Sequence, residues 1–276
     1  MFHDPNTPTR AKLLKYPRFM LAATSSGLVY FLCCYPEPIL ALRLKDFNLN
    51  AIEIGMFFAI WAIFYIPSSI LVQFLPRKIS KRVTIITSSA LCGFGFLLFG
   101  PSRVLGMPDS LVILGLGQAF IGTFTAIMII PGLPEMVEFA QNTFGQKYER
   151  EINDLSAGIF NAFLGIGQGC APLFGSLSMS QLGWRYTSDI VAFTCIMFAL
   201  IYYSFGGGSQ AFSKTLNNFR EKPSDFKEPL LPVPVPEKGN KIFNDARSYR
   251  SYFTTSQGFR VPMAPSCFVG GYDRSA

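Results

Sequence analysis

A carboxylate flanked by prolines is the first feature of this sequence that could do chemistry. Glu37 stands in the run Tyr35-Pro36-Glu37-Pro38, late in a long apolar stretch. Pro36 and Pro38 interrupt a helix, so they can form a hinge and leave Glu37 beside irregular backbone. Acids are rare and costly inside lipid, which makes Glu37 our candidate for binding a cation or carrying a proton. The simpler alternative is a carboxylate at the membrane surface that reaches water.

A glycine-rich run in a later apolar stretch is the second feature. Gly165 and Gly169 are four residues apart, a spacing that lets another helix approach closely. Pro172 follows them and bends the helix, and Gly175 comes less than one turn later. We interpret the run as a helix-packing surface, and as a hinge or seal if the bundle moves.

Two amides in the same stretch have two interpretations. Asn161 and Gln168 are uncharged polar groups at membrane depth. Such side chains commonly form hydrogen bonds between neighbouring helices. The alternative is that both face a solute pathway and take part, with Glu37, in binding a substrate or a proton.

A basic turn and a nearby acid form the third feature. Lys78, Lys81 and Arg82 lie in the short segment between two apolar stretches, where they set topology and attract anionic lipid. Glu135 follows directly after the run 131–134, Pro-Gly-Leu-Pro, at the end of another stretch. Glu135 is either an acidic gate partner of the basic turn or part of a helix terminus at the interface.

The sequence offers no enzyme, metal or cofactor chemistry. It contains a single histidine, His3, and no hydrolase, kinase or haem motif. Its six cysteines include no CxxC pair, so they predict neither a zinc site nor a disulfide framework. We therefore predict no cofactor, no bound metal and no enzyme activity.

Membrane helices must position these groups. Half of the 276 residues are apolar, 28 are Phe and 15% are charged. A helix needs about 20 mostly apolar residues to cross a bilayer. Six segments approach or exceed this length: residues 19–42, 54–75, 83–100, 111–130, 155–178 and 190–205. The predicted fold class is an all-α membrane protein with six transmembrane helices, whose surroundings are the lipid bilayer.

The two tryptophans differ in predicted depth. Trp184 has the position of an interfacial aromatic anchor, whereas Trp61 lies near the middle of its span.

Basic residues orient the six spans. With a cytosolic N-terminus, ten bases outside the long tail fall on the inside and four on the opposite face. Both termini are therefore predicted to be cytosolic, in a vesicle, an endomembrane or the plasma membrane. The net charge of +7 does not indicate nucleic acid, because the bases flank apolar segments instead of lining one surface.

Three segments follow from this pattern. Residues 1–18 form a cytosolic N-terminal segment, and residues 19–205 form the six-helix transmembrane bundle. Residues 206–276 form a cytosolic tail, which begins with three glycines and contains a proline-rich run at 229–236. We expect this tail to be largely disordered, because it offers no periodic apolar face.

The basic turn resembles a motif of the major facilitator superfamily. In that family a loop joins the second and third helices of each six-helix half, and Lys78, Lys81 and Arg82 match its basic positions. Gln73 and Arg77 stand where the family pattern has Gly and Asp.

Other motifs in order along the chain are similar to the C-terminal half of the family's vesicular amine and polyamine transporter branch. The run 165–175 with Pro172 resembles the antiporter-type motif of the fifth helix of a half. The run 183–185, Gly-Trp-Arg, is typical of the segment before the last helix. Residues 36–42 and 131–135 also resemble helices of this branch, and the resemblance covers residues 15–205.

This resemblance implies one six-helix bundle with a 3+3 repeat and proton-coupled antiport of a small organic cation, such as an amine or polyamine. Glu37 would then be the cation or proton site, and Asn161 and Gln168 would face the cavity. The family has twelve helices in two rocking bundles, so the resemblance also implies a second six-helix half, as a homodimer or a separate chain.

Two alternatives remain beside a half-length transporter. The first is a membrane scaffold or accessory subunit without transport of its own, which the replacement of Gly and Asp by Gln73 and Arg77 favours. The second is a truncated fragment of a twelve-helix transporter.

Overall fold

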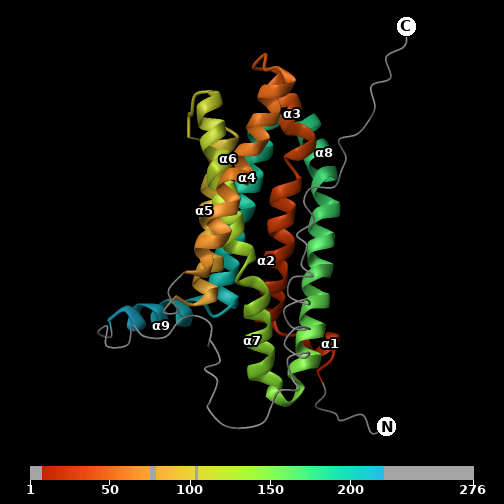
Figure 1. Cartoon of the computed structure of the whole chain (residues 1–276), viewed down its shortest axis with the longest axis vertical. Coiled ribbons are helices and arrows are strands. Elements are labelled where there is room, and N and C mark those ends of the chain that lie inside the picture. The colour runs from red at the N-terminus through yellow and green to blue at the C-terminus, as the bar shows by residue number, and fades with distance from the viewer. Residues whose placement is uncertain (1–7, 75–78, 103–104, 221–276) are drawn as a thin grey trace, which may run out of the picture. The chain divides into compact units, whose positions relative to one another are not determined.

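The computed structural model describes residues 8–74, 79–102 and 105–220, and every regular element in this part of the chain is helical (Figure 1). The all-α class predicted from the sequence is confirmed. The elements are α1 (Arg10–Leu13), α2 (Pro17–Cys34), α3 (Glu37–Lys45), α4 (Ala51–Gln73), α5 (Lys81–Phe99), α6 (Leu111–Ile129), α7 (Gly132–Phe144), a 3-10 helix (Gln146–Tyr148), α8 (Glu149–Phe205) and α9 (Gly208–Arg220). We name the end of the bundle that carries α1 and α9 the α9 end, and the opposite end the α3 end.

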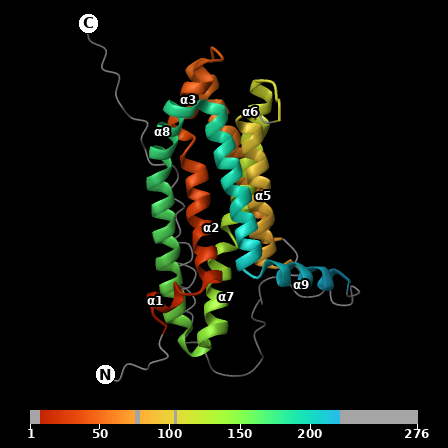
Figure 2. The same ribbon diagram turned by 180° about the vertical axis from the view of Figure 1, so that it is seen from behind.

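The described part of the chain makes six passes, although α8 is a single long element. Among the described residues, five helical segments are long and apolar enough to cross a membrane, and the last, Gln146–Phe205, has 60 residues. At 1.5 Å per residue this is about three times the hydrocarbon thickness. α8 bends back at Gly183, whose φ of 77° and ψ of 173° only glycine adopts readily. Figure 2 shows α8 rising to the α3 end and then returning to the α9 end.

Prolines break two of the predicted spans into two helices each. α2 ends at Cys34, and α3 begins at Glu37 with Pro36 as its N-cap and Pro38 in its first turn. α6 likewise ends at Ile129, and α7 follows with Pro131 as its N-cap. Proline is tolerated at these positions because the first residues of a helix have no intrahelical acceptor for their N–H groups.

A capping box starts α4 three residues before the predicted span. The Asn50 side chain accepts hydrogen bonds from the backbone N–H groups of Ile52 and Glu53, both at 3.0 Å. The Glu53 carboxylate accepts in turn from the Asn50 N–H at 2.8 Å. Reciprocal bonds of this kind satisfy donors that the first turn leaves unpaired.

Close backbone contact holds α2 against the first part of α8. A Cβ atom on Gly167 would lie 2.0 Å from the carbonyl oxygen of Gly27, and one on Gly175 would lie 2.4 Å from that of Tyr35. Both pairs are separated by 140 residues (167 minus 27, and 175 minus 35). The two helices therefore run parallel and keep one register over this distance.

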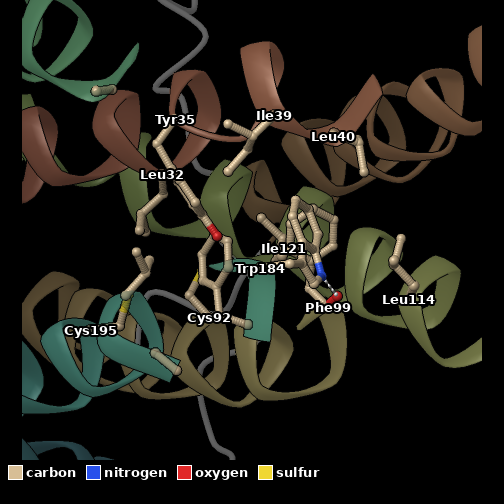
Figure 3. Packing of buried hydrophobic residues seen from close by; sticks show 14 of the residues in the cluster. Leu32, Tyr35, Ile39, Leu40, Cys92, Phe99, Leu114, Ile121, Trp184 and Cys195 are labelled. Carbon is tan, nitrogen blue, oxygen red and sulfur yellow. Dashed lines mark hydrogen bonds between the residues drawn. The ribbon is translucent and has the colours of Figure 1, made fainter. Parts of the chain in front are cut away.

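Aromatic side chains fill the core near the α3 end (Figure 3). Tyr35, Phe96, Phe99 and Trp184 are each at most 5% exposed. Trp184 Nε1–H donates to the Phe99 carbonyl at 3.3 Å, and the two ring centroids are 4.8 Å apart. Trp184 is thus a core residue, and the expectation of an interfacial anchor is wrong, because the reversal at Gly183 turns the ring inward.

Two helices keep one face exposed. α4 is strongly apolar, yet only two of its 23 residues, Phe57 and Ser68, are buried. The first part of α8 exposes small or short side chains at helical spacing: Gly158, Asn161, Ala162, Gly165, Gly169, Cys170 and Ser176. A Cβ atom on Gly165 or Gly169 would meet no described atom within 4 Å, so within this bundle Gly167 and Gly175 make the close approach instead. The exposed faces are accessible to lipid or to another bundle.

The tail differs from the expectation at its start. The sequence predicts a largely disordered chain from residue 206, whereas Gly208–Arg220 form α9. Ala211, Phe212, Thr215 and Leu216 repeat at helical spacing, and Ala211 and Thr215 are buried against the bundle. This apolar face is too short to stand out in a polar segment. The proline-rich run at 229–236 lies outside the described residues.

We expect Gly167→Ala to destabilise the bundle by about 1–3 kcal/mol, because the new methyl group overlaps the Gly27 carbonyl and forces α2 and α8 apart. Thermal unfolding of the purified full chain in detergent measures the effect. Gly165→Ala is the matched control, since its methyl group enters open space and alanine favours helix by up to about 1 kcal/mol. Equal melting temperatures for the two variants would contradict the packing described here.

Candidate functional site

Glu37 is the first residue of α3, and its side chain is exposed. The first turn of a helix carries partial positive charge from unpaired N–H groups, which favours a carboxylate there. The break at Pro36 therefore provides Glu37 with both access and a stabilising local field. This geometry suits a titratable or cation-binding group near the α3 end, and it equally suits a carboxylate that reaches water.

The three residues predicted to bind a substrate or proton lie at different depths. The constant register of 140 places Glu37 level with about Leu177, nine residues beyond Gln168 and sixteen beyond Asn161. These separations correspond to about 14 Å and about 24 Å along the bundle. Asn161 is exposed and Gln168 is half-buried. The structure therefore does not bring Glu37 together with the two amides.

An aromatic cluster lies at mid-depth, near the level of Gln168. Trp61 and Tyr65, one turn apart on α4, stack with ring centroids 4.6 Å apart and planes 25° apart. Tyr30 and Cys33 of α2 are close enough to Tyr65 to interact electrostatically with it. Tyr30 of α2 therefore lies within electrostatic range of the Trp61–Tyr65 stack on α4.

The aromatic side chains are partly exposed, and Trp61 packs against the edge of the core. Tyr30, Trp61 and Tyr65 are all half-buried. Trp61 Nε1 is buried and has no hydrogen-bond partner among the described residues. A buried donor without a partner costs about 1–3 kcal/mol.

Ion pairs join three helices at the α9 end. Glu135 of α7 is 2% exposed, and its Oε1 lies 2.6 Å from Arg18 Nη2 and 3.5 Å from Arg82 Nε. Arg18 stands at the start of α2 and Arg82 at the start of α5. The basic turn and Glu135, which the sequence placed in possible contact, therefore meet, and Arg18 joins them.

The basic turn makes two further contacts at this end. Arg82 Nη1–H donates to the carbonyl oxygens of Gly206 and Gly207, at 3.3 and 3.0 Å, where α8 ends. Lys81 Nζ pairs with Glu138 Oε2 at 2.5 Å in a more exposed position. Lys78 lies outside the described residues.

A second group of ion pairs lies at the α3 end. Asp109, in the segment before α6, pairs with Arg43 of α3 and lies 3.7 Å from Arg185 Nη2. Arg43 also pairs with Asp46 at 3.0 Å. Arg43, Asp109 and residues 182–186 line a cavity of about 500 Å³. The pairs connect α3, the start of α6 and the turn of α8.

Three residues of these sites, Arg18, Trp61 and Tyr65, were not predicted from the sequence, because their sequence patterns are common ones. Arg18 counts in the sequence as one of several topology bases, although it is the last base before the first span. Trp61 and Tyr65 are four residues apart, which places them on one helix face, but aromatic pairs at this spacing are common in packed helices. Among the described residues, no three His, Cys, Asp or Glu side chains gather as a metal site would require.

Long apolar passes, with most of the described charges near the two ends, define a multi-pass integral membrane protein. A family model described as Major Facilitator Superfamily matches residues 19–268, and the chain belongs to that family. Its members are solute transporters and not enzymes. The match confirms the resemblance found in the sequence. That resemblance ends at residue 205, whereas the match continues to residue 268 and so includes residues that the structure does not describe.

A named relative agrees with this assignment. The chain is similar to the MFS-type transporter SLC18B1 of Homo sapiens, with 26% identity over 192 residues and 68% of this chain covered. The aligned part is 41% of that protein, so the chain spans less than half of its relative's length. The similarity supports the vesicular amine and polyamine branch that the motifs indicated.

We expect Glu135→Gln to destabilise the full chain by about 3 kcal/mol, because it leaves the partly buried Arg18 and Arg82 near each other without their buried counter-charge. Glu138→Gln removes the more exposed Lys81 pair and should cost no more than about 1 kcal/mol. Melting temperatures of both variants in one detergent give the comparison. A Glu135→Gln protein as stable as Glu138→Gln would show that the buried pair does not hold the α9 end together.

Proposed function

We propose that this chain is one six-helix half of a secondary transporter for a small organic cation such as an amine or polyamine. The observation that carries the proposal is the half-buried Trp61–Tyr65 stack of α4 at mid-depth, with Tyr30 of α2 within electrostatic range of it. Transporters of this architecture place their substrate sites near the bilayer midplane. The human relative is an MFS-type transporter, which supports a transport role for this chain as well.

Aromatic rings are suited to an organic cation in lipid surroundings. An ammonium group over the face of Trp or Tyr is attracted by about 2 kcal/mol or more when both are desolvated. The Trp61–Tyr65 stack offers such a face, and Gln168 lies level with about Leu28, near the depth of Tyr30. We assign Gln168 to the same pathway and Asn161 to a position nearer the α9 end.

Proton coupling is assigned to Glu37. Its exposed carboxylate in the first turn of α3 can exchange a proton with a water-filled path. Pro36 and Pro38 form the hinge at which α3 can tilt relative to α2. The α9 end, with its excess of bases, faces the cytosol in this proposal, so both chain ends are cytosolic. The bundle comprises residues 19–205, and the Glu135 ion pairs act as the cytosolic gate.

A second six-helix half completes the pathway. The exposed stripe of small residues on α8, including Gly165 and Gly169, permits close approach of another bundle, and Pro172 lies beside it. The apolar exposed face of α4 offers further surface. The second half is a second copy, a separate chain or another part of a longer protein.

A scaffold or accessory subunit is the second candidate function. The replacement of the family's Gly and Asp by Gln73 and Arg77 favours it, because these positions belong to the gating loop. In this case the exposed faces of α4 and α8 would bind a complete transporter, and the aromatic cluster would have no ligand.

The substrate assignment is tested by Trp61→Leu. Proteoliposomes that hold the purified full chain, with any six-helix partner that copurifies, are given an acidic lumen and labelled polyamine or monoamine. We expect Trp61→Leu to reduce uptake at low substrate concentration at least tenfold, through loss of about 1.4 kcal/mol or more of cation binding. Phe64→Leu is the control, because Phe64 is exposed on the same helix.

Two outcomes would contradict the proposal. Equal uptake by both variants would remove the cluster from the pathway. Absence of uptake by the wild-type chain, together with a native-gel mass of a lone monomer, would favour the scaffold.

The coupling role is tested separately by Glu37→Gln. We expect this variant to bind amine but to lose uptake driven by the pH gradient, because a carboxamide cannot carry a proton. Amine-exchange across the membrane without a pH gradient should persist. Gradient-driven uptake at the wild-type rate would show that Glu37 only reaches water at the membrane surface.

A further inference from the structure

α9 lies across the direction of the spans instead of continuing the last one (Figures 1 and 2). It begins at Gly208, three residues after α8 ends at Phe205. The second part of α8 crosses the membrane, so this short link holds α9 at the membrane surface. The axis of α9 therefore runs along that surface.

One face of α9 is apolar. At 100° per residue, the side chains of 211, 212, 215 and 216 occupy an arc of about 140°. Ala211 and Thr215 are buried, and the Ser80 N–H donates to Thr215 Oγ1 at 3.2 Å. The Phe212 ring packs against Tyr203 with centroids 5.8 Å apart. The apolar arc thus faces the bundle, on the side of α9 that is turned toward the membrane.

The edge of this arc extends beyond the protein. Leu216 is 66% exposed, and Phe205, at the end of the last span, is 69% exposed. Large apolar side chains are unfavourable in water, so their exposure indicates contact with lipid. Lipid at the boundary between headgroups and acyl chains accounts for both exposures at once.

The opposite face of α9 is polar and carries positive charge. Gln210, Ser213, Lys214 and Asn217 are exposed there. The helix contains Lys214 and Arg220 and no acidic residue. An amphipathic helix with bases on its polar side and apolar residues on the other is suited to an anionic lipid surface.

We propose that α9 is an interfacial anchor that binds anionic phospholipid. Phe212 and Leu216 enter the boundary between headgroups and acyl chains, and Lys214 and Arg220 attract the headgroup phosphates. This inference depends on the membrane-spanning bundle and not on transport, so it holds for either function considered above.

The test places an encoded fluorescent amino acid at position 216 of the full chain, in nanodiscs of phosphatidylcholine with some phosphatidylserine. In separate samples, one or the other lipid is brominated at equal mole fraction. We expect bromolipid to quench the probe at 216 and not the probe at 213, which is the matched control on the polar face. Brominated phosphatidylserine should quench more, because each base enriches anionic lipid by up to about fivefold.

Charge neutralisation separates lipid contact from lipid selection. In Lys214→Gln/Arg220→Gln, brominated phosphatidylserine should quench the 216 probe no more than brominated phosphatidylcholine. Equal quenching by both lipids in the unsubstituted chain would overturn the proposal. Absence of quenching of the 216 probe by either bromolipid would also overturn it, because position 216 would then be surrounded by water or by another protein. Melting temperatures identify a variant that fails to fold.

Discussion

Lipid gives apolar helices no hydrophobic reason to associate, because acyl chains are as apolar as the side chains they would leave. The six passes must therefore be held by close contact and hydrogen bonds between helices. Gly167 against Gly27 and Gly175 against Tyr35 let two backbones meet over more than two turns. The Ser89 hydroxyl donates to the Cys195 carbonyl at 2.9 Å and joins α5 to the second part of α8 in the same way. The register set by these contacts determines the depth of each functional side chain.

The charged groups at the α9 end depend on this register as well. Glu135 is buried, and a buried carboxylate is tolerated only with partners. Arg82 contacts Glu135 and also the carbonyls of Gly206 and Gly207, in the link between the last span and α9. One guanidinium therefore connects α5, α7 and the end of α8. A tilt of any of these elements must break or exchange some of its bonds, which is the property that a gate requires.

Hydropathy and proline positions predicted the six passes and the break at Pro36, because both depend on local chemistry alone. The packing glycines could not be identified in this way: Gly165 and Gly167 occur in one run, and only the partner helix decides which of them faces inward. The same limit applies to Glu37, Asn161 and Gln168, whose separation in depth follows from the α2–α8 register. α9 was missed because its apolar arc comprises a few residues within a polar segment, and burial against Ser80 and Tyr203 is what stabilises it.

The distance between Glu37 and the aromatic cluster bears on how proton and cation would be coupled. Glu37 lies seven residues beyond Tyr30, or about 10 Å along the bundle. No direct ion pair can form over this distance. Two unit charges 10 Å apart at an effective dielectric constant of about 20 still interact by about 1.7 kcal/mol. Couplings of 1–3 kcal/mol are typical between linked sites. An ionised Glu37 would thus favour a cation at the cluster, and its protonation would weaken that binding by more than tenfold without any contact between them.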